Sequence, residues 1–150
     1  MTLYAAYATS LDPARLADIA PHSPLWASGW LDGWRLTFGG GDIGWDGALA
    51  TIVEDPGNQV FVMVYDLHDL DAQALDKWEG TDLGLWRKIR VRVDTMNGSA
   101  LAWVYVLDAF EGGLPSAHYL GLLADAAEAG GAPDDYVSAL RRHPCRSISD

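Results

Sequence analysis

The hydrophobic positions of the N-terminal half follow the short runs and the alternation that are typical of strands. Residues 2–7 form an apolar run of the length expected for a buried strand. Residues 25–38 carry alternating large side chains interrupted by glycines, and they predict one long bent strand or two short ones. Residues 48–53 predict the next strand, and the turn chemistry of residues 55–58 predicts a hairpin whose second arm runs to about residue 66.

The sharpest alternation lies between residues 85 and 93. One face is mainly apolar and predicted to point inward, and its members are Leu85, Ile89, Val91 and Val93. The opposite face carries Trp86, Lys88, Arg90 and Arg92. Asn97-Gly98 is typical of a two-residue hairpin turn and returns the chain along residues 100–107. A solvated basic face paired with carboxylates is the favoured interpretation of this strand, and an anion-binding face is the alternative.

Helical spacing and capping residues separate these strands and fill the last third of the chain. Predicted helices run from Asp12-Pro13 to about residue 20, from about Asp69 to Glu79, from Ser116 to about residue 129, and from residues 132–135 to Arg142. Five or six strands with interspersed and terminal helices indicate an α+β fold around a strongly bent sheet or small barrel. With no repeat or linker, residues 1–150 are predicted to form a single domain.

Composition narrows the classes of function. Hydrophobic residues make up 49% of the 150 residues, as expected of a packed globular protein. The formal net charge of -11 disfavours nucleic acid and anionic membranes as partners, so a small-molecule ligand is expected. Cys145 is the single cysteine, and the sequence shows neither a leader nor a membrane-spanning apolar run. These features predict a cytoplasmic protein, and they leave a homodimer open.

Glu79 is the strongest candidate for chemistry because it stands where a helix is predicted to end. The apolar positions before it recur at helical spacing, and they are Leu67, Leu70, Ala74, Leu75 and Trp78. Gly80 suits the residue that stops a helix. The negative end of the helix dipole and an apolar border both disfavour a carboxylate, so the pKa of Glu79 is predicted to be raised, as suits a proton shuttle. The alternative is a surface glutamate at a frayed helix end.

Other apparent motifs do not predict a site. Gly39, Gly41 and Gly44 have the spacing of a dinucleotide-binding loop, but a strand follows them where a helix would have to receive the phosphates. The four histidines are scattered without the spacing of metal ligands, and no serine or cysteine lies in a nucleophile signature. The sequence therefore predicts neither a metal nor an organic cofactor.

An ordered set of short segments resembles the gamma-glutamylcyclotransferase-like (AIG2-like) family. Residues 3–11 resemble its N-terminal strand and Y-G-S-N-L loop, and residues 45–52 resemble its W-x-G-x-A-T-I strand. Residues 75–80, with the sequence LDKWEG, are similar to its L-D-x-x-E-G segment. The remaining matches are the turn at residues 55–57, Trp86 in the place of a substrate-side tyrosine, and a P-S-x-x-Y segment at residues 115–119. Each segment is weak alone, but their common order is fairly specific.

The resemblance implies a gamma-glutamylcyclotransferase-like fold, a small bent mixed β-barrel with flanking helices. It also implies a reaction in which the amine of a γ-glutamyl compound attacks its own γ-carbonyl and releases 5-oxoproline and an amine or amino acid. Glu79 is then the catalytic acid/base, and no cofactor or metal is needed. The substrate-binding residues implied are Tyr7, Ala8, Thr9, Ser10, Leu11, Trp86 and Tyr119.

The loop departs from the family pattern at three adjacent positions. Ala8, Thr9 and Ser10 stand where the family has Gly, Ser and Asn. A methyl group at Ala8 limits close approach to the backbone, and Ser10 lacks the amide donor of Asn. Two alternatives to the cyclotransferase therefore stay open. One is a non-catalytic protein that binds a small molecule or a partner on the same fold, and the other is an enzyme that cleaves or transfers a γ-glutamyl amide.

Overall fold

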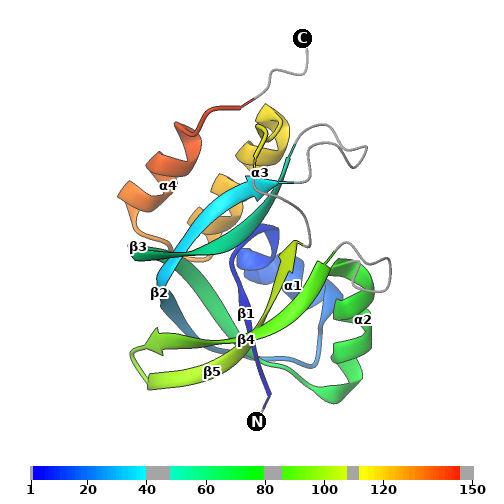
Figure 1. Cartoon of the computed structure of the whole chain (residues 1–150). Coiled ribbons are helices and arrows are strands. Elements are labelled where there is room, and N and C mark those ends of the chain that lie inside the picture. Colours follow the sequence, from blue (N-terminus) through cyan, green and yellow to red (C-terminus); the bar gives the residue numbers. More distant parts are fainter. Residues whose placement is uncertain (1, 40–47, 80–85, 108–111, 146–150) are drawn as a thin grey trace.

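Five strands in the described part of the chain close into a barrel in the order β1-β3-β2-β4-β5 (Figure 1). The computed structural model describes residues 2–39, 48–79, 86–107 and 112–145. The strands are β1 Leu3–Ala6, β2 Leu25–Gly39, β3 Leu49–Asp66, β4 Trp86–Thr95 and β5 Gly98–Leu107. β1 pairs antiparallel with β3 and parallel with β5, whereas the other pairs are antiparallel. The predicted small mixed barrel is confirmed.

The helices pack on the outside of this barrel. They are the 3-10 helix η1 Thr9–Leu11, α1 Pro13–Ile19, α2 Asp69–Glu79, α3 Ala117–Ala129 and α4 Asp134–Arg141. α3 and α4 lie beside the far ends of β2 and β3, and α2 lies beside β4 (Figure 1). Two predicted caps are confirmed, because the Asp12 carboxylate accepts from the Ala14 amide at 3.0 Å and Ser116 Oγ accepts from the Tyr119 amide at 3.1 Å.

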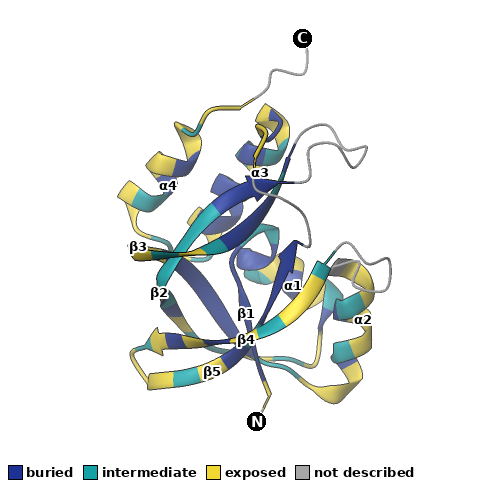
Figure 2. Cartoon of the chain, viewed as in Figure 1, coloured by how far each residue is buried: buried dark blue, intermediate teal, exposed yellow. Residues whose placement is uncertain are grey.

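The core has one part inside the barrel and one between the barrel and the helices. β1 contributes side chains to both parts of the core. Leu3 and Ala5, together with Tyr7 just after the strand, pack with the valines inside the barrel. Tyr4 and Ala6 pack with the outer cluster around Leu16. All four residues of β1 are buried, which explains why its sequence is a continuous apolar run (Figure 2). The N-terminal strand therefore stands between the two halves of the core.

The hairpin predicted at residues 55–58 is wrong. Val53 and Val60 do not face each other across a turn, because both pair with β2, Val53 with Arg35 and Val60 with Leu31. β3 runs through the segment, and the extra residues form a bulge opposite Gly33, whose φ is +84°. The Asp55 carboxylate holds the bulge together by accepting from Arg35 Nε and Asn58 Nδ2, both at 2.8 Å.

The apolar face predicted for α2 is only partly buried. Leu75 is fully buried, but Leu70 is 70% exposed and Trp78 is 38% exposed. Arg15 covers the Trp78 ring, with its guanidinium carbon 5.6 Å from the ring centroid. The helix begins at Asp69, as predicted, and the residue before it caps it, because the ring Nδ1 of His68 accepts from the Leu70 amide at 3.1 Å. α2 is therefore held by few apolar contacts.

A pair of carboxyl groups lies near the contact between β2 and β4, where Trp30 is paired with Asp94. The pKa of Asp32 is raised from 3.8, first by its hydrogen bond to Asp94, then by desolvation and by the Asp94 charge. A carboxyl group with a raised pKa holds its proton more firmly in the folded state. Its ionisation therefore costs stability as the pH rises above 3.8.

Asp32→Asn should consequently raise the melting temperature at pH 7, because it removes the repulsion between two carboxylates. The gain should shrink as the pH is lowered from 7 to 4, because Asp32 of the parent protein is protonated to a growing extent over this range. Thermal unfolding followed by circular dichroism at both pH values measures this. In an Asp94→Asn background the same substitution should give no gain at pH 7, and an equal gain there would show that the pair is not its source.

Candidate functional site

The segment after β1 forms one wall of the candidate site. Tyr7 is buried and its hydroxyl donates to the backbone carbonyl of Tyr105 on β5. Ser10 is 2% exposed and shares a 2.9 Å hydrogen bond with the hydroxyl of Tyr4. The Leu11 amide donates to the Ala8 carbonyl at 3.0 Å, which closes the turn into η1. These contacts fix the loop against β1 and β5.

A small cavity lies between this loop and the start of the β4–β5 ribbon. Its volume is about 20 Å³, which is room for roughly one water molecule. The residues around it are Tyr4, Tyr7, Ala8, Ser10, Trp86 and Tyr105. The cavity therefore joins one end of β1 to residues about a hundred positions away in the sequence.

Four of the predicted substrate-binding residues meet at this cavity, namely Tyr7, Ala8, Ser10 and Trp86. The other three predicted positions are placed differently. Thr9 begins η1, and Leu11 is 1% exposed within the core. Tyr119 lies on α3, and its hydroxyl accepts from the Ala50 amide at 3.0 Å, so it braces α3 against β3. A substrate contact stays a prediction for all seven residues.

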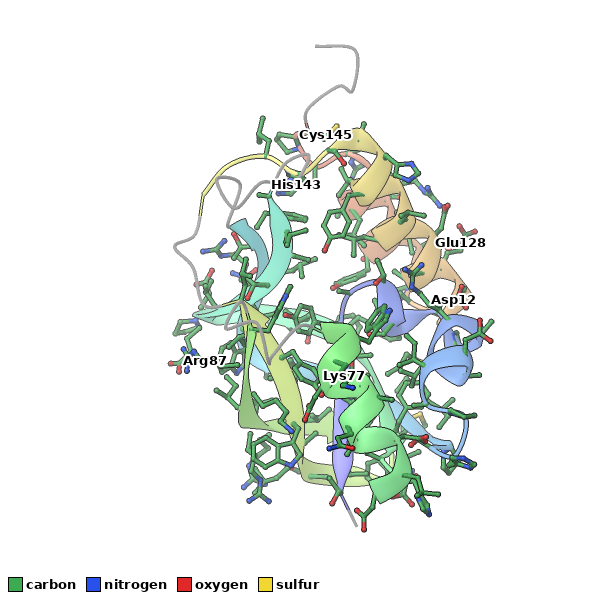
Figure 3. All side chains as sticks on the ribbon, turned by 90° about the vertical axis from the view of Figure 1, so that its right-hand side faces the viewer. Asp12, Lys77, Arg87, Glu128, His143 and Cys145 are labelled. Atoms are coloured by element: carbon green, nitrogen blue, oxygen red, sulfur yellow. The ribbon has the colours of Figure 1, made fainter. Side chains whose placement is uncertain are left out.

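Glu79 is the last residue of α2, as the sequence predicts. Its side chain and Gly80 lie outside the described residues. α2 covers the side of the barrel near β4, and Figure 3 shows this helix in front with Lys77 labelled. The helix therefore carries the Glu79 backbone along the side of the barrel that bears Trp86.

Tyr105 and Asp76 are site neighbours that the sequence reading did not single out. The hydroxyl of Tyr105 donates to Asp76 Oδ1 at 2.6 Å, and Lys88 Nζ lies 3.1 Å from the same oxygen. The Tyr105 ring also packs edge-on against Tyr4, with 5.6 Å between centroids. Strand alternation places Tyr105 on the face of β5 that bears Trp103, but only the fold brings Asp76 to it.

The basic face of β4 is exposed, as predicted, and only part of it is paired with acids in the described structure. Lys88 pairs with Asp76, whereas Arg90 stacks 5.4 Å from the Trp103 ring centroid and Arg92 donates to Ser99 Oγ at 3.0 Å. None of the three basic side chains is among the described residues around the small cavity. This arrangement favours a solvated face over an anion-binding one.

A larger cavity of about 480 Å³ opens where β2 and β4 diverge. It is bounded by Trp34 on β2, residues 51–54 on β3, Arg87 and Ile89 on β4, and Val106 and Leu107 on β5. Arg87, labelled in Figure 3, lies at the side of the barrel. The volume of the larger cavity falls in the range of small-molecule sites, about 300 to 1,000 Å³. On β4 the two cavities use opposite faces, because the neighbouring residues Trp86 and Arg87 point to opposite sides.

The residues of the four described segments contain no cluster of three or more His, Cys, Asp or Glu side chains that could hold a metal ion. No helix in that same part of the chain has the length and apolar character needed to cross a membrane.

The mixed barrel with helices outside it is the fold of a known class of enzymes. A solved structure of a gamma-glutamyl cyclotransferase superposes with a TM-score of 0.86 at 26% identity, covering 97% of this chain and 89% of the other. Gamma-glutamylcyclotransferase of Bos taurus is 30% identical over 143 residues, or 92% of this chain and 76% of the relative. The Homo sapiens protein of the same name is 28% identical over 144 residues, or 93% and 77%.

Residues 59–140 match the AIG2-like family. The chain belongs to this family and is a gamma-glutamylcyclotransferase-like enzyme. The fold and the family that the resemblance of the short segments implied are thus confirmed.

The hydrogen bond from Tyr7 gives the first test of how the loop is held. Tyr7→Phe should lower the free energy of unfolding by about 1 kcal/mol, because a buried carbonyl loses its donor. Tyr65→Phe is the matched control, since the buried Tyr65 hydroxyl has no hydrogen-bond partner in the described structure and desolvation raises its pKa to about 12. The control should be neutral or stabilising. Urea unfolding of both variants measures the difference, and equal losses would contradict it.

Proposed function

We propose that this protein converts a γ-glutamyl amino acid or γ-glutamyl amine to 5-oxoproline and the free amine or amino acid. The observation that carries the proposal is the joint retention of the family fold and of Glu79 at the end of α2. The names of the Bos taurus and Homo sapiens relatives support the same reaction class.

The reaction needs one proton shuttle. The α-ammonium group of the substrate first loses one proton to solvent, and the freed amine attacks the γ-carbonyl carbon to form the new C–N bond while Glu79 takes a second proton from the attacking nitrogen. The protonated Glu79 then returns its proton to the departing nitrogen as the old C–N bond breaks. Because the attack is intramolecular, much of the rate gain comes from holding the substrate in a folded conformation.

The segment from Tyr7 to Leu11 is the proposed wall for the glutamyl part of the substrate. Its backbone N–H groups would donate to the glutamyl carboxylate or to the developing oxyanion. The hydrogen bonds of Tyr7 and Ser10 support this role, because a loop held on both sides keeps its donors in place without reorganisation.

A non-catalytic binding protein is the second candidate, and the cavity sizes are the observation that favours it. The cavity at the loop has about 20 Å³, with Ala8 in its wall, whereas the cavity where β2 and β4 diverge has about 480 Å³. A small ligand held in the larger cavity would not require Glu79. The two candidates differ in whether a product is released.

The first experiment follows 5-oxoproline release while the purified protein is incubated with γ-glutamyl amino acids, γ-glutamyl amines and glutathione. Release from at least one member of the panel is expected. No release from any member, together with binding of one of them in calorimetry, would favour the binding protein over the enzyme.

Glu79→Gln tests the proton shuttle itself. The substitution keeps the size and hydrogen-bonding capacity of the side chain and removes its titrating proton, so turnover should fall about 100- to 10,000-fold. Substrate affinity should change little, and the melting temperature should be unchanged or slightly raised. Lys77→Gln on the same helix is the control for a surface change and should keep the parent rate. A Glu79→Gln variant with the parent rate would remove this residue from the mechanism.

A further inference from the structure

α2 is tied to the rest of the protein by two aspartates, one near each end. Asp71, in its first turn, is 3% exposed and accepts from the His22 amide at 2.8 Å and from Ser23 Oγ at 2.6 Å. Asp76 is half-buried in the second half of the helix and accepts from Tyr105 and Lys88. Between them, Leu75 is the buried apolar contact. The two ends of α2 are therefore fixed by polar contacts more than by apolar area.

In the described structure, the last turn of α2 contacts α1 through Trp78. This side chain is 38% exposed, and the guanidinium carbon of Arg15 lies 5.6 Å from its ring centroid. The last carbonyl groups of a helix have no intrahelical partner, so a final turn frays unless side chains hold it. Asp76 stands three residues before Glu79, which is the spacing at which helix side chains are neighbours. A contact made by Asp76 consequently restrains the turn that carries Glu79.

The partner of Asp76 belongs to the wall of the candidate site. Tyr105 is 3% exposed, borders the small cavity, packs against Tyr4 and offers its backbone carbonyl to Tyr7. Its hydroxyl gives Asp76 a charge-assisted hydrogen bond of 2.6 Å, and the Lys88 ammonium group adds a second positive contact to the same carboxylate. One residue thus connects the loop after β1, the β4–β5 ribbon and the end of α2.

We propose that Asp76 is a positioning residue that sets where Glu79 stands relative to the loop from Tyr7 to Leu11. The inference rests on the proposed function, since it assigns Asp76 a part in the same reaction. Its carboxylate lies in the second half of a helix, where the helix dipole disfavours negative charge. The bonds from Tyr105 and Lys88 offset that cost. Because both partners lie on the β4–β5 ribbon, the bonds form only when the last turn of α2 lies against that ribbon.

The activity test compares two variants of Asp76, one without and one with an acceptor for the Tyr105 hydroxyl. Asp76→Ala removes both contacts and should lower kcat about 10- to 100-fold with KM changed little, because a misplaced acid/base slows the chemical step. Asp76→Asn keeps an acceptor for Tyr105 and should recover part of that loss. Tyr105→Phe should lower kcat like Asp76→Ala, and the double variant should lose little more than either single variant. Asp125→Asn, which breaks the exposed pair with Arg141, is the surface control and should be neutral.

Hydrogen exchange provides a readout that does not depend on turnover. In Asp76→Ala the amides of residues 77–79 should exchange faster, while those of the buried strand β1 should keep the parent rate. If the parent protein has no activity on any substrate but this exchange pattern is found, the restraint is supported and the proposed function fails. Unchanged exchange would overturn the inference, whatever the kinetics. Faster exchange with an unchanged kcat would overturn it as well.

Discussion

The pairing of β1 with two partners is the constraint on which the other parts of the structure depend. β1 closes the barrel by lying antiparallel to β3 and parallel to β5, and its residues fill both the barrel interior and the core under the helices. The strand that follows β1 in the sequence, β2, is not its neighbour in the barrel, so the chain leaves β1 through η1 and α1 before it returns to the sheet. The loop at Tyr7 to Leu11 begins this connection and is held by the hydrogen bonds of Tyr7 and Ser10.

The loop after β1 and the helix α2 are held by contacts of different kinds. The loop wall is held by buried hydrogen bonds of Tyr4 and Tyr7, whereas α2 is held by Leu75 and two aspartates. Ala8, which stands where the family pattern has Gly, lies in the wall of the small cavity, so its methyl group takes up space there.

Local physical rules were sufficient for most of the fold. Asp12 and Ser116 act as helix caps, a hairpin joins β4 and β5, and alternation assigns the two faces of β4, all as the sequence predicts. The hairpin turn lies one residue earlier than predicted, because Met96 and Asn97 stand between the paired residues Thr95 and Gly98. The rules failed where a distant partner decides the structure. The turn residues at 55–58 became a bulge because β2 is long enough to pair with β3 on both sides of them.

The candidate site was also predictable only in part, because some of its contacts join residues that are distant in the sequence. Short ordered segments indicated Tyr7, Ala8, Ser10 and Trp86, which meet at one cavity. The hydrogen bond between Asp76 and Tyr105 joins residues 29 positions apart, and no periodic pattern encodes it. The exposure of Leu70 was missed because helical spacing reports an apolar stripe, while burial also requires a surface to cover that stripe.

The most direct test of the account is a crystal structure of the Glu79→Gln variant with a γ-glutamyl compound bound. The account predicts that the side chain at position 79 lies within about 3 Å of the reacting nitrogen or carbonyl oxygen. The glutamyl carboxylate should meet the backbone amides of the loop from Tyr7 to Leu11. A ligand bound instead in the cavity where β2 and β4 diverge, with no contact to position 79 or to that loop, would contradict it.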